Sequence, residues 1–195
     1  MKLLILSLVA FFIGSIPTGL IIAKANGVDL KKKGSGNIGA TNVLRSVGKW
    51  QAFITLTGDF LKGVIAVLIG RHFFEGHLYY EGIVGLFSIL GHNYSIFLKF
   101  RGGKGVATSL GVLNIYSPQT GLFTIIIWIM TVLITKYSSL GALISFGVMP
   151  LSILLFDSRE KFPIALLISG LLFIRHRDNI ARLTKGTEPK VGAKS

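Results

Sequence analysis

The sequence predicts an all-α integral membrane protein with about seven transmembrane helices, some of them short or partial. Hydrophobic residues make up 51% of the 195 residues and charged residues only 15%, against about 25% charged residues in a soluble domain. Mean hydropathy is +0.66, and apolar segments long enough to enter a bilayer recur along the chain. This composition excludes a disordered chain and argues against a soluble globular domain. The absence of cysteine excludes a disulfide framework, thiolate catalysis and cysteine-bound zinc.

The first apolar segment is Leu3–Ala23, which carries no charge and is long enough to cross a bilayer. A cleaved signal peptide is the alternative, because Lys2 precedes the segment and residues 23–25 resemble a cleavage site. Three lysines at 31–33 follow closely, and flanking lysines hold their end of a span in the cytoplasm. We therefore expect an uncleaved first span with the N-terminus outside.

Six further spans are expected, and they are Gln51–Gly70, Gly82–Leu98, Val106–Ile115, Gly121–Thr135, Leu140–Phe156 and Phe162–Ile174. The uncharged stretch 105–135 would be roughly 46 Å long as one helix, against a hydrocarbon core of about 30 Å. Ser117-Pro118 is a turn signal, so we divide the stretch there. The fourth and seventh spans are short enough to be re-entrant or partial helices. The loops are too short for a soluble domain, so residues 1–195 form a single transmembrane domain.

The formal net charge of +13 supports this topology. Seven spans place the C-terminus in the cytoplasm, as the positive-inside tendency requires for a basic tail. The whole excess then lies on one face, where three acidic residues (Asp29, Asp178 and Glu188) stand against the basic residues Lys24, Lys31, Lys32, Lys33, Arg45, Lys49, Lys99, Arg101, Lys104, Lys136, Arg175, Arg177, Arg182, Lys185, Lys190 and Lys194. Asp59 and Lys62 lie one helical turn apart within the second span, and we expect them to pair.

The first predicted cytoplasmic loop contains a G-x-G-x-x-G pattern at 34–39. It is not a dinucleotide fingerprint, because a lysine run and a membrane span precede it instead of a β-strand. Its glycines still allow backbone N–H groups to approach an oxyanion. From Gly39 the spacing predicts a surface helix with an apolar stripe (Ala40, Val43, Leu44, Val47) and a polar stripe (Thr41, Asn42, Arg45, Lys49). A solvated interfacial loop is the alternative.

The third loop is the Gly-Gly-Lys-Gly turn at 102–105, which leads into a predicted helix. It is not a Walker A loop, since Leu98 and Gly105 occupy positions that require glycine and serine or threonine. Such a turn is still a good phosphate cradle, with Lys104 as a point charge. The alternative is a basic loop that touches anionic lipid. His92 ends the third span beside this loop.

The tail after Ile174 is basic, and as a helix it would carry His176 and Asn179 on one face, with Asp178 and Arg182 at pairing distance. His176 can act as an acid or base near neutral pH, but a hydrogen-bonding role is favoured at such a surface. Two glycine-rich loops and a basic tail on one side together predict a small anionic substrate at the cytoplasmic surface.

These segments closely resemble the bacterial acyl-phosphate:glycerol-3-phosphate acyltransferases, the PlsY family. The matching residues are 35–42 with Arg45, then Gly91-His92 through Phe97-Leu98 to 102–108, and His176 with Asn179-Ile180, Arg182-Leu183, Gly186 and Glu188. Together with the spans they cover nearly the whole chain. Ser95 departs from the proline expected there. The His-x4-Asp motif of other acyltransferases is absent, because none of the four histidines has aspartate five residues later.

The resemblance implies transfer of a fatty acyl group from acyl phosphate to the sn-1 hydroxyl of glycerol 3-phosphate. The products are lysophosphatidic acid and phosphate, in bacterial phospholipid biosynthesis, without a metal or other cofactor. It implies catalytic roles for Ser35, Arg45, His176 and Asn179. It implies a structural role for Glu188, and substrate binding by Asn37, Thr41, Asn42, His92, Gly102, Gly103, Lys104 and Gly105. We expect a monomer in the bacterial cytoplasmic (inner) membrane, with membrane lipid around it, an active site on the cytoplasmic face and no nucleic-acid partner.

We expect direct attack by the glycerol hydroxyl, because phosphate, with a second pKa of about 6, leaves readily. Ser35 would orient substrate, since no Ser/His/Asp arrangement activates it. The base is either His176 or the phosphate of the donor, with the phosphate favoured because arginines around His176 lower its pKa. An organic-phosphate transporter is the rival function, but no inverted repeat is visible. A lipid-binding scaffold would leave Ser35, Asn37 and Asn42 unexplained.

Overall fold

The computed structural model describes residues 1–192, and every regular element in that part of the chain is helical. The α-helices are α1 (Lys2–Ser15), α2 (Thr18–Ala25), α3 (Ala40–Ser46), α4 (Lys49–Phe74), α5 (Leu78–Asn93), α6 (Val106–Tyr116), α7 (Pro118–Thr135), α8 (Ser138–Phe156), α9 (Phe162–Arg175) and α10 (Arg177–Thr184). Lys194, one of the basic residues of the tail, lies outside the described residues. The prediction of an all-helical chain is confirmed.

The first predicted span is not one continuous helix. It breaks between α1 and α2 at Ile16-Pro17, because proline has no N–H and disfavours helical backbone in the residue before it. The freed carbonyl of Ile16 accepts a hydrogen bond from the Lys62 ammonium, which also contacts the Asp59 carboxylate at 2.5 Å. The predicted Asp59–Lys62 pair is therefore confirmed, and it is anchored at the break.

The other predicted spans coincide with helices, with one correction. The third span was expected to reach Leu98, but α5 ends at Asn93 and the short 3-10 turn η2 (Ile96–Leu98) follows. Ser95 stabilises this turn by donating a hydrogen bond to the Ser15 carbonyl at 2.5 Å. The division at Ser117-Pro118 is confirmed, since Pro118 is the first residue of α7. The surface helix after Gly39 is confirmed as α3.

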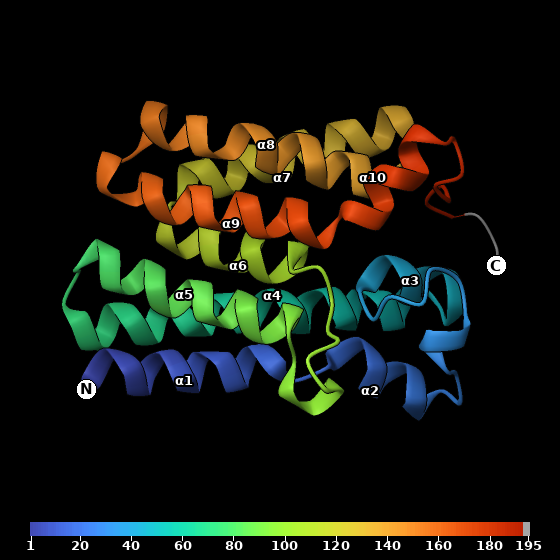
Figure 1. The fold of residues 1–195 in the computed structure, drawn as a ribbon, viewed down its shortest axis with the longest axis horizontal. Coiled ribbons are helices and arrows are strands. Elements are labelled where there is room, and N and C mark those ends of the chain that lie inside the picture. Colours follow the sequence, from blue (N-terminus) through green and yellow to red (C-terminus); the bar gives the residue numbers. More distant parts are fainter. Residues whose placement is uncertain (193–195) are drawn as a thin grey trace.

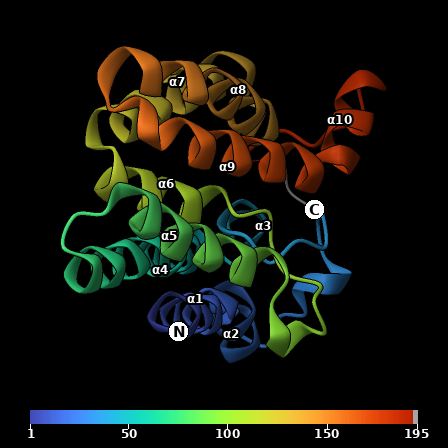
Figure 2. The same ribbon diagram turned by 60° about the vertical axis from the view of Figure 1, so that its left-hand side comes forward.

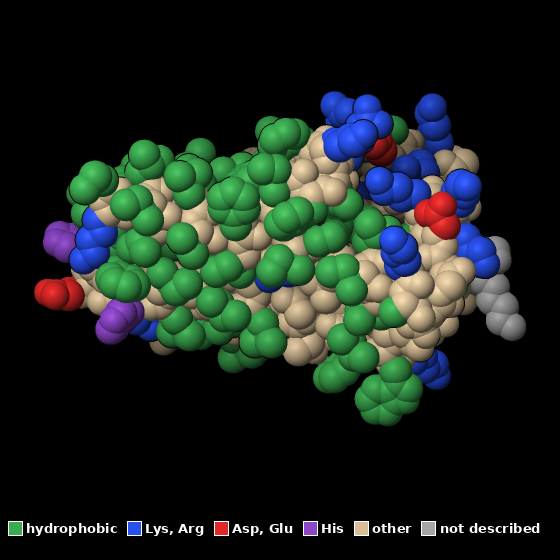
Figure 3. All heavy atoms as spheres, turned by 90° about the horizontal axis from the view of Figure 1, so that it is seen from below, with side chains coloured by type: hydrophobic (Ala, Val, Ile, Leu, Met, Phe, Trp, Pro, Cys, Tyr) green, Lys and Arg blue, Asp and Glu red, His purple; other side chains and the backbone are tan. Residues whose placement is uncertain are grey.

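Four helical segments within residues 1–192 are long and apolar enough to cross a membrane by themselves: α1 with α2, α4, α7 and α8. Helices α5, α6 and α9 are shorter. Apolar side chains cover the middle of the molecule, and Lys and Arg gather at the end that carries α3 and α10 (Figure 3). The covering side chains are strongly exposed, with Ile134 and Leu155 each 76% exposed. Such a surface is typical of contact with lipid.

Helix α6 lies between two layers of the bundle, with α4 and α5 on one side and α7, α8 and α9 on the other (Figures 1 and 2). It lies very close to α4, because a Cβ atom at Gly63 would be only 2.1 Å from the Thr108 carbonyl oxygen. On its other face Leu113 packs into the buried core with Phe146, Met149 and Ile168. The N-terminus of α6 is thereby held at the basic end of the molecule.

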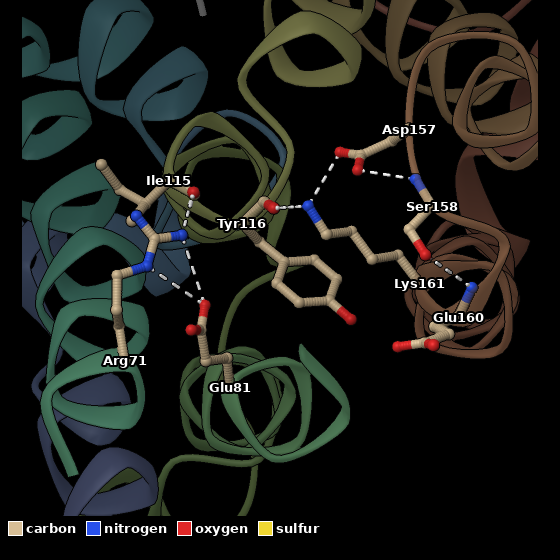
Figure 4. A network of polar contacts seen from close by, with 8 residues as sticks. All are labelled: Arg71, Glu81, Ile115, Tyr116, Asp157, Ser158, Glu160 and Lys161. Atoms are coloured by element: carbon tan, nitrogen blue, oxygen red, sulfur yellow. Dashed lines mark hydrogen bonds and ion pairs between the residues drawn. The ribbon is translucent and has the colours of Figure 1, made fainter. Parts of the chain in front are cut away.

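The C-terminal end of α6 is capped by cations from both layers (Figure 4). Arg71 donates to the Ile115 carbonyl at 2.8 Å and pairs with Glu81 at 3.3 Å. Lys161 donates to the Tyr116 carbonyl at 2.6 Å and pairs with Asp157 at 2.9 Å. The last carbonyls of a helix lack partners within the helix and carry partial negative charge, so these cations stabilise the buried end of α6.

Candidate functional site

The cytoplasmic loops predicted from the sequence meet around one cavity at the basic end of the bundle. The cavity has a volume of about 370 Å³. Of the predicted site residues, those that line it are Ser35, Asn37, Thr41, Asn42, Arg45, His92, Lys104, Gly105, His176, Asn179 and Glu188. Segments more than 140 residues apart in the sequence thus converge. Gly102 and Gly103 are not among the residues that line it.

This cavity has a polar end and an apolar wall. The apolar wall is built by Phe53 and Leu56 of α4 and by Trp128 and Val132 of α7. A second cavity, of about 380 Å³, adjoins the polar end and shares Ser35, Asn37 and Lys104 with the first. Its remaining walls include the side chains of Arg175, Arg177 and Arg182. The site therefore offers one compartment in which four cationic residues accompany the carboxylate residue Asp178, and one compartment lined partly by hydrocarbon.

The loop before α3 is organised by Asn42, one of the predicted substrate-binding residues. Its amide nitrogen donates to the carbonyls of Lys33 at 3.1 Å and Asn37 at 2.8 Å. Its amide oxygen accepts from the Ser35 N–H at 3.1 Å. Asn42 was expected on the outward polar stripe of the helix, but it is buried and points back into the loop. These contacts hold the backbone of Ser35 and Asn37 at the edge of both cavities.

The glycine loop before α6 is held against the end of α5. The N–H groups of Gly102 and Gly103 donate to the carbonyls of Asn93 at 3.2 Å and His92 at 2.9 Å. The His92 ring lies directly beneath the loop, since a Cβ atom at Gly103 would be 2.1 Å from its Nε2 atom. Gly105 has φ of +81°, a left-handed conformation that favours glycine. The loop thus enters α6 with Lys104 at the cavity wall.

Lys104 is tied to the tail by a chain of polar contacts. Its ammonium donates to the Asn179 amide oxygen, and the Asn179 amide nitrogen donates to the Glu188 carboxylate at 2.6 Å. Glu188 also accepts from Ser139 at 2.7 Å and from Arg182 at 2.7 Å. Helical spacing allows Asp178 and Arg182 to pair, but Arg182 pairs with Glu188 instead, and Asp178 lies 3.7 Å from Arg177. Glu188 therefore links α8, α10 and the segment after α10.

Burial changes the protonation behaviour of this cluster. Burial lowers the pKa of Lys104 to about 8, so its ammonium loses a proton more easily than the ammonium of a surface lysine does. Burial also lowers the pKa of His176 to about 4, although its hydrogen bond to the Leu172 carbonyl opposes the shift. His176 is therefore neutral at pH 7. Its Nδ1 atom lies 2.9 Å from the Leu172 oxygen, so we assign the proton to Nδ1, which leaves Nε2 as an acceptor.

The pKa of the Glu188 carboxyl is also lowered, but burial is not the cause. Burial by itself would raise it, but the hydrogen bonds from Ser139, Asn179 and Arg182 outweigh burial and hold the pKa below its usual range. Glu188 is thus ionised at neutral pH beside the cationic residues of the site.

Several contacts at the site were not foreseen from the sequence. Arg175, expected only as one of several basic tail residues, donates to the carbonyls of Gly102 and Gly103 at 2.9–3.1 Å. Arg45 donates a hydrogen bond to the Lys190 carbonyl at 3.1 Å. The hydroxyl oxygens of Thr41 and Ser138 lie 3.2 Å apart. No signal in one sequence distinguishes Arg175 from Arg177, since both are arginines in the same charged run.

A helical bundle with a lipid-type surface and a cavity rich in cationic residues at one end is typical of a membrane protein with an anion-binding site. The family model described as "Glycerol-3-phosphate acyltransferase" matches residues 4–186. The chain therefore belongs to the glycerol-3-phosphate acyltransferase family. It is an integral membrane acyltransferase. The resemblance noted in the motifs is confirmed.

Relatives and solved structures agree over nearly the whole chain. The glycerol-3-phosphate acyltransferase of Geobacter sulfurreducens is 46% identical over 191 residues, which cover 97% of this chain and 98% of that protein. One from Thermus thermophilus is 44% identical and covers 96% and 94%. The crystal structure of PlsY (YgiH), an integral membrane glycerol 3-phosphate acyltransferase, in its glycerol 3-phosphate form is 40% identical with a TM-score of 0.92 and covers 98% and 96%. The lysophosphatidic acid form is 39% identical with a TM-score of 0.90 and covers 97% and 95%.

Proposed function

We propose that this chain transfers a fatty acyl group from acyl phosphate to the sn-1 hydroxyl of glycerol 3-phosphate. The products are lysophosphatidic acid and inorganic phosphate, and residues 1–195 act as a single domain. The observation that carries the proposal is the pair of adjoining cavities that share Ser35, Asn37 and Lys104. Two substrates that each carry phosphate can meet at the shared wall, while one of them extends a hydrocarbon chain along the apolar wall.

The residues that line the cavities support one substrate in each cavity. Glycerol 3-phosphate is small and anionic, and it fits the second cavity, where Arg177 and Arg182 accompany Lys104. The acyl chain fits the first cavity, against Phe53, Leu56 and Trp128. The neighbouring structure is named as a glycerol 3-phosphate form, which supports glycerol 3-phosphate as a substrate of this chain.

The chemistry is a direct acyl transfer. The sn-1 hydroxyl oxygen attacks the acyl carbon of acyl phosphate, the bond from that carbon to the phosphate oxygen breaks, and phosphate departs with the bonding electrons. The hydroxyl proton passes to the leaving phosphate, whose second pKa is about 6. The pKa of His176, about 4, supports this choice, because a base so weak is poorly matched to the reaction at pH 7.

The protein supplies position and charge in this mechanism. Lys104 and Arg45 neutralise the charge of the phosphate groups and the negative charge that develops in the transition state. The Nε2 atom of His176 accepts a hydrogen bond from substrate. Among residues 1–192, no histidine or carboxylate forms a hydrogen bond with the Ser35 hydroxyl, which supports an orienting role for Ser35 over a nucleophilic one. Asn37 and Thr41 line the donor cavity, whereas Asn42, His92, Asn179 and Glu188 hold the loops that bind substrate.

We also propose seven spans, with the N-terminus outside and the site on the cytoplasmic face of the bacterial inner membrane. The gathering of Lys and Arg at the end of the molecule that carries the site supports this orientation (Figure 3). A monomer is sufficient, because the residues assigned to both substrates come from one chain.

One assay tests the reaction. Purified protein in detergent receives acyl phosphate and labelled glycerol 3-phosphate, and we expect lysophosphatidic acid and phosphate in equal amounts. A transporter gives no product under these conditions. A covalent acyl-Ser35 species trapped with acyl phosphate alone would rule out direct transfer.

The role of Lys104 is tested by its alanine variant. Lys104→Ala should raise KM for glycerol 3-phosphate much more than it lowers Tm, because the lost ammonium binds phosphate. Lys136→Ala is the matched control, since Lys136 is exposed at the same end and lies outside both cavities. An unchanged KM in the Lys104 variant would remove Lys104 from the site.

A further inference from the structure

We infer that Arg175 is a positioning residue for the phosphate site: its guanidinium fixes the Gly102 and Gly103 carbonyls and thereby directs the amide of Lys104 toward substrate. This inference rests on the proposed function, in which the glycine loop binds glycerol 3-phosphate. It gives a role to Arg175, at the end of α9, which lines the second cavity but has no stated part in the mechanism above.

Three hydrogen bonds join Arg175 to the loop. Its Nε donates to the Gly103 oxygen at 3.1 Å, and its Nη2 donates to the Gly102 oxygen at 3.1 Å and to the Gly103 oxygen at 2.9 Å. The residues lie 72 and 73 positions apart in the sequence. The two carbonyls therefore accept from a cation, at a place where free carbonyl oxygens would repel a phosphate.

The peptide between Gly102 and Gly103 is held from both sides. Its carbonyl accepts from Arg175, and its N–H donates to the His92 carbonyl at 2.9 Å. In a trans peptide the C=O and N–H bonds point in opposite directions. One group on α9 and one at the end of α5 thus set the orientation of this peptide plane, which glycine by itself would leave free.

The next peptide, between Gly103 and Lys104, is held on one side only. Arg175 binds its carbonyl with two donors, so its N–H points away from the guanidinium. Among the described residues, the Lys104 N–H has no hydrogen-bond partner. A free N–H beside the Lys104 ammonium, one residue before the turn into α6, is a donor available to a phosphate oxygen.

A lysine could not replace Arg175 in this arrangement. The guanidinium lies over the Tyr94 ring, with 5.1 Å between its central carbon and the ring centroid. The planar fork lets two nitrogens bind two carbonyls, whereas an ammonium is a point charge on a flexible stem. The ring contact and the fork together hold the orientation of the loop.

The experiment compares Arg175→Lys with wild type, and Lys185→Met serves as the control because Lys185 is exposed and lies outside both cavities. In Arg175→Lys, we expect KM for glycerol 3-phosphate to rise about tenfold, the scale of a single charge-assisted hydrogen bond. We expect kcat and KM for acyl phosphate to change less than about threefold. Amide hydrogen exchange of residues 100–105 should become faster in the protein without substrate, while exchange within α6 stays unchanged.

The outcomes separate the possible roles of Arg175. If amide exchange becomes faster but KM for glycerol 3-phosphate is unchanged, the contact of Arg175 with the loop is merely structural. If this KM rises but exchange is unchanged, Arg175 contacts the substrate directly. Either result overturns the inference. If Arg175→Lys does not fold, Tyr94→Leu decides the question, because it removes the aromatic ring under the guanidinium and should raise the same KM more than Tyr94→Phe does. Failure of the proposed function is distinct, since wild type itself would then form no lysophosphatidic acid.

Discussion

Replacing Glu188 with alanine should loosen the tail from the bundle and lower Tm by about 6–12 °C. The Glu188 carboxylate accepts from Ser139, Asn179 and Arg182 at 2.6–2.7 Å. Alanine removes all three acceptor contacts at once. It also frees the Asn179 amide, whose oxygen accepts from Lys104, so the substrate site should loosen together with the tail.

The magnitude follows from the burial of the three donors. Asn179 is 4% exposed and Ser139 is 8% exposed, so water does not readily replace their lost acceptor. An unsatisfied buried group costs about 1–3 kcal/mol, and two such groups near the lower end of that range cost about 3 kcal/mol. The Arg182 side chain is 34% exposed, so solvent screens its contact and the total stays at about 3 kcal/mol. About 2–4 °C per kcal/mol, as expected for a chain of this size, gives the shift above.

The assay is a thermal melt in detergent, followed together with acyltransferase activity. Glu160→Ala is the control, because Glu160 is an exposed carboxylate at the other end of the bundle with no ion-pair partner among residues 1–192. Its Tm should stay within about 2 °C of wild type. If Glu188→Ala melts within that same margin, the hydrogen bonds of Glu188 contribute little and the reasoning is refuted.

The pKa of Glu188 gives the same prediction a pH dependence. Because the folded pKa is below the unfolded value, the stabilisation is fully present above about pH 4.3, the usual Glu value, and is lost as pH falls through the folded pKa. The Tm of wild type should therefore fall more steeply below pH 4.3 than the Tm of Glu188→Gln. Parallel curves for the two proteins would contradict this assignment.

Three further predictions concern protonation and packing. The kcat/KM for glycerol 3-phosphate should fall as pH rises through about 8, the pKa of Lys104. The variant Lys104→Arg should move that fall above pH 10. If the variant and wild type have the same pH profile, Lys104 is not the source of the fall. Because the pKa of His176 is about 4, its titration should cause no change in kcat between pH 6 and 7.5. A change in kcat near pH 6.5 that disappears in His176→Gln would refute the neutrality of His176. A change caused by the phosphate of the substrate would persist in that variant. Gly63→Ala should force α4 and α6 apart and lower Tm by several degrees, because its Cβ atom would be 2.1 Å from the Thr108 oxygen. Gly170→Ala meets open space and should leave Tm unchanged or raise it; equal Tm values for the two variants would show that the helices separate at no cost.

Helix positions were largely predictable because apolar length and turn signals are local properties. The boundary at Ser117-Pro118 and the surface helix after Gly39 were both correct. The errors came where tertiary contacts decide. The end of α5 at Asn93 depends on the hydrogen bond between Ser95 and Ser15, and an apolar run of sequence carries no sign of that partner.

The residues of the site were predictable as a group, but their partners were not. Glycine-rich turns beside lysine and arginine indicate an anion site from composition alone. Asn42 was expected to face outward, because helical spacing assigns it to the polar stripe, yet its three loop contacts bury it. Helical spacing allows Arg182 to pair with Asp178 in its own helix, but Arg182 pairs with Glu188 instead. Spacing predicts neighbours within a helix, whereas the chain beyond the helix supplies competing partners.

The sequence by itself determined the all-helical class, the concentration of basic residues in a few segments and the family of the enzyme, since these follow from composition, periodicity and contiguous motifs. Only the tertiary structure decided that Lys104 contacts Asn179, that Arg175 holds the glycine loop and that two cavities share a wall. The physical reason is that each of these contacts joins segments that lie far apart in the sequence. Their existence depends on how α6 packs between two layers of helices, and no local pattern in the chain encodes that packing.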